Sequence, residues 1–293
     1  MKEKPINFVK YSALGNDYIV IDPNKNSFDP DKTVIKNICN RNFGIGADGI
    51  LLGPIIDWKN KTISVRIFNS DGSEAEKSGN GLRIFSQYLM DEGYIQKKTF
   101  GIDGKRSSSI IIKTIGGEVR STFNSDGTIS IQMGKIEFYN EEIEVEAFNE
   151  DNLEEKTKFK GTYLSIGNPH FVIILDRVDE KIAKKYGKSI ENNSIFPNKT
   201  NVQFAQVLNE KNIKIEIFER GSGYTLASGS SACAAAATTF KKGLIKNEVE
   251  VLMQGGSLKV LIDDDFNVLQ IGKVKKIFYG KFFISTFLDK FQN

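Results

Sequence analysis

The two halves of this 293-residue chain carry the same short motifs at a nearly constant spacing. The first half contains Gly15-Asn16-Asp17-Tyr18, Ile67-Phe68, Ser78-Gly79 and Gly93, and about 150 positions later the second contains Gly167-Asn168-Pro169-His170, Ile217-Phe218, Ser228-Gly229 and Gly243. This spacing far exceeds the ~20–50 residues of solenoid or propeller repeats, so it indicates a duplicated domain. Two such lobes, related by a pseudo-two-fold axis, can present the same kind of group to one cleft from opposite sides. Chemistry on both faces of a single carbon needs that geometry.

Composition narrows the class of protein. The length suits two domains with cores of their own, and 40% hydrophobic with 26% charged residues is typical of a soluble globular protein. The 40 basic residues are interleaved with 37 acidic ones, and without a basic stripe nucleic acid is not an expected partner. We also expect no signal peptide and no membrane span. Cys39 and Cys233 are far apart, without metal-ligand spacing, so we expect free thiols in a reducing cytoplasm.

Local patterns predict mixed secondary structure. Leu82, Phe85 and Leu89 recur at helical spacing after Gly81, and the alanine-rich stretch 231–242 favours a helix small enough to be buried inside a curved sheet. The acidic stretch 141–158 is interpreted as a solvated connection or a surface excursion. Strands are expected at 98–102, 109–114, 118–123, 129–133 and 276–288, the last returning to the first domain.

A Ser-Gly tetrapeptide precedes the expected central helix in each half, at Ser78 and at Ser228. The free N–H groups and the positive end of a helix dipole favour an anion there, either a phosphate or a carboxylate. Neither turn matches a P-loop or a dinucleotide-binding fingerprint. A nucleotide is therefore the less attractive ligand.

The longer motifs around these turns resemble those of diaminopimelate epimerases. The resemblance rests on stretches 68–74 and 79–81 (FNSDGSE, GNG) and on 219–223 and 225–229 (ERGSG, TLASG), and it extends in order to 14–17, 41–49, 167–170 and 201–204. It covers nearly the whole chain. It implies an α/β (α+β) fold of two pseudo-symmetric lobes, each a curved, mostly antiparallel sheet or barrel wrapped around a central helix, with the active site between them. We expect residues 1–133 plus 279–293 to form the N-terminal lobe, which carries Ser78, and residues 134–278 to form the C-terminal lobe, which carries Ser228.

The resemblance also implies an activity and a set of site residues. The family inverts an amino acid at its α-carbon by a two-base mechanism, without pyridoxal phosphate, another cofactor or a metal. The acid/base positions are Ser78 and Ser228, tuned or aligned by His170 and Glu219. The substrate-binding positions are Asn16, Asn69, Gly79, Asn80, Asn168, Asn201, Glu219, Arg220, Gly229 and Ser230. A small-molecule amino acid substrate is the expected partner, and a homodimer is the expected assembly.

The departure from the family lies at the two acid/base positions, where the family has cysteine and this chain has Ser78 and Ser228. A helix N-terminus can convert a thiol to a thiolate, whereas an alkyl hydroxyl is a far weaker acid, and Cys233 lies too far into its helix to take over. Three explanations stay open: an engineered, quenched thiol enzyme; a natural variant with altered chemistry or a non-catalytic binding descendant; and a slow serine epimerase.

The retained asparagines and Arg220 favour a substrate with two amino acid ends, because Arg220 suits a bidentate grip on a carboxylate. Diaminopimelate, converted from the LL to the meso form for lysine and cell-wall synthesis, is the leading expectation. Lanthionine and histidine are alternatives, since Tyr224 replaces the family's acidic residue.

Overall fold

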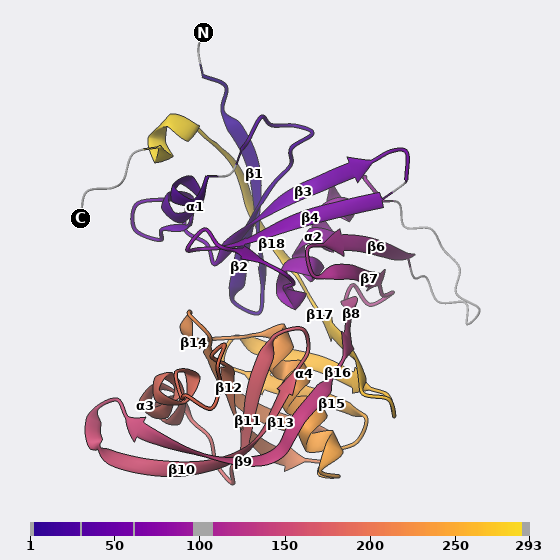
Figure 1. Ribbon diagram of the computed structural model, residues 1–293. Helices are drawn as coiled ribbons and strands as arrows, with labels where there is room; N and C mark the ends of the chain where they lie inside the picture. Colours follow the sequence, from indigo (N-terminus) through magenta and orange to yellow (C-terminus); the bar gives the residue numbers. More distant parts are fainter. Residues whose placement is uncertain (1–2, 30, 61, 96–107, 289–293) are drawn as a thin grey trace. The chain divides into compact units, whose positions relative to one another are not determined.

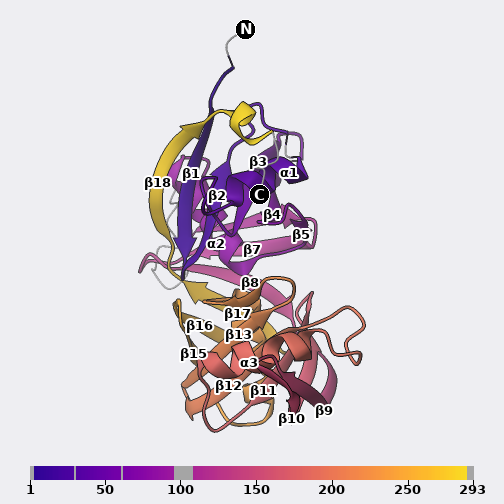
Figure 2. The same cartoon turned by 90° about the vertical axis from the view of Figure 1, so that its left-hand side faces the viewer.

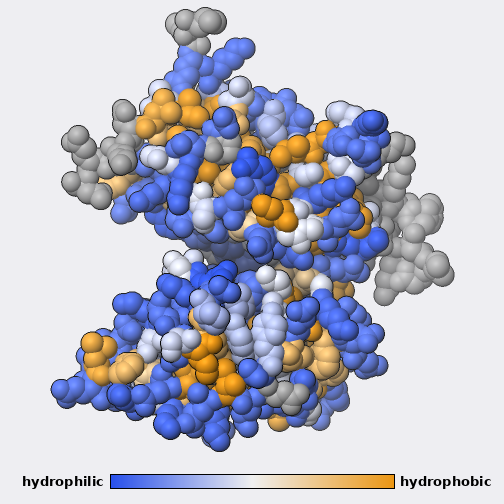
Figure 3. Space-filling view, viewed as in Figure 1, coloured by the Kyte–Doolittle hydropathy of each residue, from blue (hydrophilic) through white to orange (hydrophobic). Residues whose placement is uncertain are grey.

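The computed structural model describes residues 3–29, 31–60, 62–95 and 108–288, and these form two compact units. One unit is made of 1–131 with 272–293 and the other of 132–271. We call them lobe 1 and lobe 2. The stretch 98–102, expected as a strand, lies outside the described residues. Figure 3 shows polar residues over most of each lobe's visible surface, with small apolar groups between them.

Lobe 1 is a mixed sheet around a helix. Its elements are β1 (Ile6–Ala13), β2 (Asn16–Ile21), α1 (Lys32–Cys39), β3 (Gly49–Asp57), β4 (Thr62–Asn69), β5 (Glu74–Ala75), α2 (Gly79–Asp91), β6 (Ser108–Thr114), β7 (Gly117–Phe123), the start of β8 (Ile129–Lys135), β18 (Lys275–Phe282) and the 3-10 helix η1 (Ile284–Phe287). The strand order is β18-β1-β2-β3-β4-β6-β7-β8. Only β2–β3 and β4–β6 among these pairs are parallel, and α1 and α2 connect them. β18 lies beside β1 in both ribbon views (Figures 1 and 2).

Lobe 2 repeats this plan. Its elements are the end of β8, β9 (Glu137–Asn149), β10 (Asn152–Ser165), β11 (Pro169–Ile174), α3 (Glu180–Glu191), β12 (Asn201–Asn209), β13 (Asn212–Glu219), β14 (Gly223–Thr225), α4 (Gly229–Lys241), β15 (Glu248–Met253), β16 (Gly256–Ile262) and β17 (Asn267–Gly272). The order is β9-β10-β11-β12-β13-β15-β16-β17-β8, again with two parallel pairs, β11–β12 and β13–β15, joined by α3 and α4. The expected fold class is therefore confirmed.

The central helices are buried because of their composition. In α4 the residues from Ala232 to Ala237 are all fully buried, since their small side chains let the surrounding strands approach closely. In α2 larger residues such as Leu82, Phe85 and Leu89 fill the same role, and all three are fully buried. The helix expected at 231–242 begins at Gly229, because Ser228 is its N-cap.

The interpretation of 141–158 as a solvated connection is wrong. These residues belong to β9 and β10, which form a long antiparallel hairpin. Val145 and Ala147 are buried while Glu144 and Glu146 are exposed, so the acidic residues occupy the outer face of a strand with a period of two. Lys158 and Lys156 pair with these carboxylates at 2.7 and 3.1 Å.

The last expected strand, 276–288, is also shorter than predicted. β18 ends at Phe282, and the chain then turns into η1. Phe287 of this turn packs against Phe282 with ring centroids 5.5 Å apart, so the apolar residues beyond the strand cover the lobe 1 core instead of extending the sheet. Among the helices of the described residues, none has the length and apolar character that crossing a bilayer requires.

Candidate active site

Ser78 is the N-cap of α2. Its backbone is extended, and its Oγ accepts a hydrogen bond from the backbone N–H of Gly81 at 3.1 Å. The first N–H groups of a helix have no acceptor within the helix, so those of Gly79 and Asn80 are available to a ligand or to solvent. The Asn80 side chain itself accepts from the buried Arg83.

Ser228 has the same place on α4. Its Oγ accepts from the backbone N–H of Ser231 and lies 3.4 Å from the hydroxyl oxygen of Ser230. Gly229 is required next to it, because a Cβ there would lie 2.5 Å from Oε1 of the buried Gln270. Each lobe therefore has a serine hydroxyl at the positive end of its buried central helix.

The sheet register places the other candidate residues of lobe 1 together. Asn16 begins β2, while Gly49, which begins the parallel strand β3, pairs with Asn69 at the end of β4. Asn16 and Asn69 thus lie at the same edge of the sheet. The Asn69 amide donates to Ser73 Oγ at 3.0 Å.

A charge network holds Asn16. Its Nδ2 donates to Asp48 at 2.9 Å, and Arg41 bridges Asp48 and Asp17 with contacts of 2.7 Å to each. Although burial opposes ionisation, hydrogen bonds from Arg41 and Lys10 keep the pKa of Asp17 below its ordinary value. This network fixes the turn between β1 and β2, where Leu14 and Gly15 have positive φ.

In lobe 2, Asn168 and His170 are in contact. His170 Nε2 lies 3.0 Å from Asn168 Oδ1, and the ring is fully buried. Burial lowers the pKa of His170 to about 3, and the charge of Arg220 acts in the same direction while the side chain of Gln203 opposes it. The imidazole is therefore neutral at neutral pH.

Gln203 makes a hydrogen bond with a residue of α4. It is fully buried, and its Nε2 donates to Ser231 Oγ at 3.0 Å. Ser231 in turn donates its backbone N–H to Ser228 Oγ. Ser231 therefore links the buried Gln203 with the serine that caps α4.

Asn201 joins two turns of lobe 2. Its Nδ2 donates to the carbonyl oxygen of Pro169 at 2.8 Å, and its Oδ1 accepts from the backbone N–H of Arg220 at 3.0 Å. Glu191, at the end of α3, accepts from the next N–H, that of Gly221, at 2.9 Å. The exposed Arg220 guanidinium donates to the carbonyl oxygen of Asn198. The turn that carries Arg220 is therefore held from both sides.

Glu219 ends β13 and is half-buried beside this turn. The nearby Tyr224, where the resemblance expects an acid, donates its hydroxyl to the buried Glu216 at 2.8 Å. Burial and this hydrogen bond raise the pKa of Tyr224. Tyr224 thus has a structural role within lobe 2.

Four residues that sequence reasoning did not single out contact the candidate residues or their immediate neighbours in sequence: Tyr18, Asp48, Gln203 and Glu191. Tyr18 lies 3.2 Å from Ser78 through its hydroxyl. The duplication points to Tyr18, because it occupies the place of His170 in the repeated motif. The other three are ordinary polar residues, and only tertiary structure reveals their contacts.

Neither cysteine is placed to replace a serine. Cys233 is fully buried in α4, and burial raises the pKa of the Cys39 thiol to about 12. Within the described ranges, no three side chains of the His, Cys, Asp and Glu types group as metal ligands.

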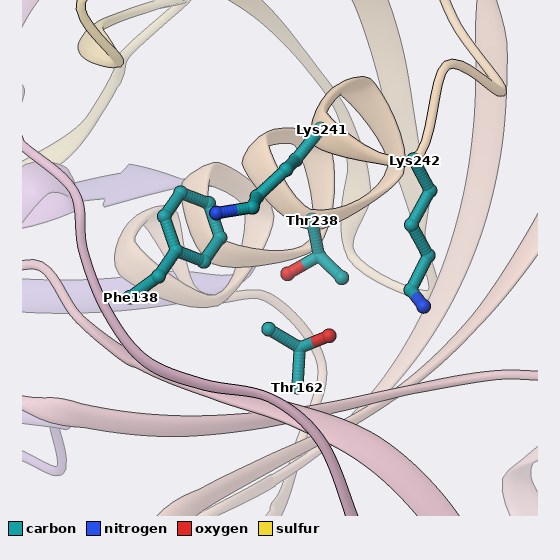
Figure 4. Close-up of a pocket in the computed structure, with 5 residues that line it drawn as sticks. All are labelled: Phe138, Thr162, Thr238, Lys241 and Lys242. Atoms are coloured by element: carbon teal, nitrogen blue, oxygen red, sulfur yellow. The ribbon is translucent and has the colours of Figure 1, made fainter.

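A small cavity of about 90 Å³ lies at the other end of α4 (Figure 4). Phe138, Thr162, Thr238, Lys241 and Lys242 line it. Lys241 lies over the Phe138 ring, with its Nζ 4.2 Å from the ring centroid. A 13-residue helix is about 20 Å long, so this cavity is remote from Ser228.

Sequence comparisons identify relatives over almost the full length. The family model described as diaminopimelate epimerase matches residues 8–139 and 162–277. Diaminopimelate epimerase 2 of Nostoc sp. is 46% identical over 282 residues, covering 94% of this chain and 95% of that protein. Diaminopimelate epimerase of Elusimicrobium minutum is 34% identical over 289 residues, covering 94% and 99%.

Solved structures share the fold at low sequence identity. A hydroxyproline epimerase from Agrobacterium vitis has a TM-score of 0.71 and 10% identity, covering 94% of this chain and 92% of that one. A probable proline racemase from Agrobacterium radiobacter has a TM-score of 0.72 and 11% identity, covering 98% and 94%.

Proposed function

This chain belongs to the diaminopimelate epimerase family and is an isomerase of the epimerase type, and on that premise we propose that it acts on the α-carbon of an amino acid by a cofactor-independent, two-base mechanism. Ser78 and Ser228 occupy the acid/base positions. One removes the α-proton, and the other returns a proton to the opposite face.

The observation that carries this proposal is the matching placement of the two serines. Each caps the buried central helix of its own lobe, beside strand ends that carry the candidate binding residues. Backbone N–H groups at Gly79-Asn80 and Gly229-Ser230 bind the α-carboxylate, where they also stabilise the negative charge that develops on deprotonation. His170 and Glu219 tune or align the two acid/base groups.

The proposed substrate is diaminopimelate, converted from the LL to the meso form. The names of the full-length relatives support this choice. Asn16, Asn69, Asn168, Asn201 and Arg220 hold the distal amino acid end. Arg220 suits its carboxylate, because a guanidinium can donate two parallel hydrogen bonds.

Serine makes this chain a weak or inactive catalyst under the proposal. A base must have a pKa near the operating pH to be effective, and an alkyl hydroxyl is much less acidic than a thiol. Changing both Ser78→Cys and Ser228→Cys therefore raises turnover strongly. The substitution is nearly isosteric, so each side chain keeps its place at the start of its helix.

Chiral chromatography of LL-diaminopimelate incubated with the double variant tests the proposal. The expected product is the meso isomer, formed much faster than by the unmodified chain. Lanthionine and histidine are assayed in parallel. Inversion of one of these instead would keep the mechanism and change the substrate.

A non-catalytic amino-acid-binding protein is the second candidate, favoured by the presence of serine at both positions. Calorimetric titration of the unmodified chain with the same amino acids discriminates the two. Tight binding together with an inert double-cysteine variant would establish the binding function and reject the epimerase.

We further propose that the protein works as a homodimer in the cytoplasm. Exposed apolar side chains on β18, with Ile277 51% and Tyr279 79% exposed, support a second copy as the partner of this strand. Sedimentation equilibrium should give twice the chain mass. A single-chain mass at assay concentrations would reject the dimer.

A further inference from the structure

The phenol of Tyr18 is in contact with the hydroxyl of Ser78. The two oxygen atoms are 3.2 Å apart, and Tyr18 is 5% exposed. The ring is seated against Gly49, its partner across β2 and β3, where a Cβ would lie 2.7 Å from a ring carbon. Glycine at this position therefore makes room for Tyr18 next to the helix cap.

The hydrogen bonds of Ser78 define what Tyr18 can do. Ser78 Oγ accepts the backbone N–H of Gly81, which fixes the side chain at the N-terminus of α2. A hydroxyl has one proton and two acceptor sites, so one acceptor site and the proton remain. The Tyr18 hydroxyl can either donate its proton to the remaining acceptor site of Ser78 or accept a hydrogen bond from the Ser78 hydroxyl. Phenols are stronger acids than alkyl hydroxyls, so this contact couples a poor acid/base group to a better one.

The duplication gives Tyr18 a counterpart. In the repeated motif Tyr18 corresponds to His170, since each is the third residue after the glycine of its turn. Tyr18 pairs with the first residue of the neighbouring parallel strand, Gly49, as His170 pairs with Asn201. Both rings are buried. The equivalent position of each lobe thus carries a side chain that can exchange a proton.

We propose that Tyr18 is a positioning and proton-relay residue for Ser78, an inference that rests on the proposed function. When the substrate carbanion is protonated, a Cα–H bond forms as the Ser78 O–H bond breaks. The Tyr18 O–H bond breaks as Ser78 regains a proton, so the negative charge moves from the α-carbon to the phenolate. In the opposite direction Ser78 takes the α-proton of the substrate as it passes its own proton to the Tyr18 phenolate. The phenolate otherwise recovers its proton from water.

The test is deuterium uptake at the α-carbon of diaminopimelate in D₂O, followed by mass spectrometry over a range of pH. It compares the full chain with Tyr18→Phe, which removes only the hydroxyl. Tyr11→Phe is the matched control. Tyr11 lies directly across the strand pair from Tyr18, is fully buried, and donates its hydroxyl to Asp91 at 2.8 Å. The same Tyr18→Phe change is also made in the Ser78→Cys/Ser228→Cys background, where a thiol supplies its own proton.

With the relay, Tyr18→Phe slows exchange by about 100-fold with little change in KM, and the alkaline rise of the pH–rate profile disappears. Tyr11→Phe retains both the rate and the profile. In the double-cysteine background the loss of the Tyr18 hydroxyl has a far smaller effect.

Two results would overturn the relay and leave the proposed function intact. One is unchanged deuterium exchange in Tyr18→Phe. The other is no exchange by the unmodified chain together with exchange by the Ser78→Cys/Ser228→Cys variant. If neither background exchanges with diaminopimelate, lanthionine or histidine, the proposed function fails and the relay with it.

Discussion

Asn201 accepts the backbone N–H of Arg220 through its side-chain oxygen at 3.0 Å. The same amide donates to the carbonyl oxygen of Pro169, so one side chain couples the turn after β13 to the turn before β11. Asn201 is 5% exposed. Its second Nδ2–H can donate to a ligand carboxylate.

Asn201→Ala should therefore weaken both folding and ligand binding. Leaving the Arg220 N–H and the Pro169 carbonyl without their partner should cost about 1–3 kcal/mol of unfolding free energy, measured by urea denaturation. Calorimetry should show weaker binding of diaminopimelate. Asn247→Ala, at an exposed position, serves as the control and should leave stability almost unchanged. Equal stability of the two variants would show that the hydrogen bonds of the Asn201 side chain do not contribute to the free energy of unfolding.

Gly229→Ala should destabilise lobe 2, because the new methyl would lie 2.5 Å from Oε1 of Gln270. Gln270 is fully buried, so it cannot move aside without disturbing the core. We expect a loss of about 1–3 kcal/mol, measured as a shift of the urea midpoint. Adding Gln270→Ala should reduce the effect of Gly229→Ala, because the clash is removed. Additive effects in this double-mutant cycle would show that the two residues are not coupled.

His170 should make stability depend on pH. Its pKa is about 3 in the folded protein and 6.5 in the reference state, so the unfolded chain binds the extra proton first as pH falls. The contribution of His170 to the free energy of unfolding is therefore fully present above about pH 6.5 and is lost progressively toward pH 3. Between pH 7 and pH 5 we expect a loss of about 2 kcal/mol.

The contribution of His170 can be separated from those of the carboxyl groups, because His170 is the only histidine in the chain and one substitution removes it. Urea denaturation of His170→Gln at the same two pH values is the control. The variant should lose most of the difference between pH 7 and pH 5. An equal difference in both proteins would show that other groups cause it.

Several features of the fold follow from sequence. The constant offset between Ser78 and Ser228 reports the duplication directly, and the run from Ala234 to Ala237 marks a helix that strands can approach closely. The β9–β10 hairpin could not be read in the same way. The high density of glutamates in this stretch suggests a solvated linker. The alternation of Val145 and Ala147 with acidic residues indicates a strand instead, when it is given more weight than the charge.

The candidate site was predictable only as a set of positions. Sequence motifs indicate Asn201 and Arg220 separately, but their hydrogen bond depends on how β12 and β13 pair. The contact between Tyr18 and Ser78 likewise depends on the close approach of the ring to Gly49. A residue that acts through a neighbour, as proposed for Tyr18 and Ser78, reaches that neighbour by tertiary packing. The local sequence around such a residue does not show the contact.

The central claim is that Ser78 and Ser228 each stand at one acid/base position of a two-base epimerase. Its most direct test is the location of deuterium after one partial conversion of LL-diaminopimelate in D₂O by the Ser78→Cys/Ser228→Cys protein. The account predicts deuterium at the inverted α-carbon of the product and hydrogen in the recovered substrate, because different groups remove and return the proton. Each single-cysteine variant should be far slower. Equal labelling of substrate and product, or full activity with only one cysteine restored, would contradict it.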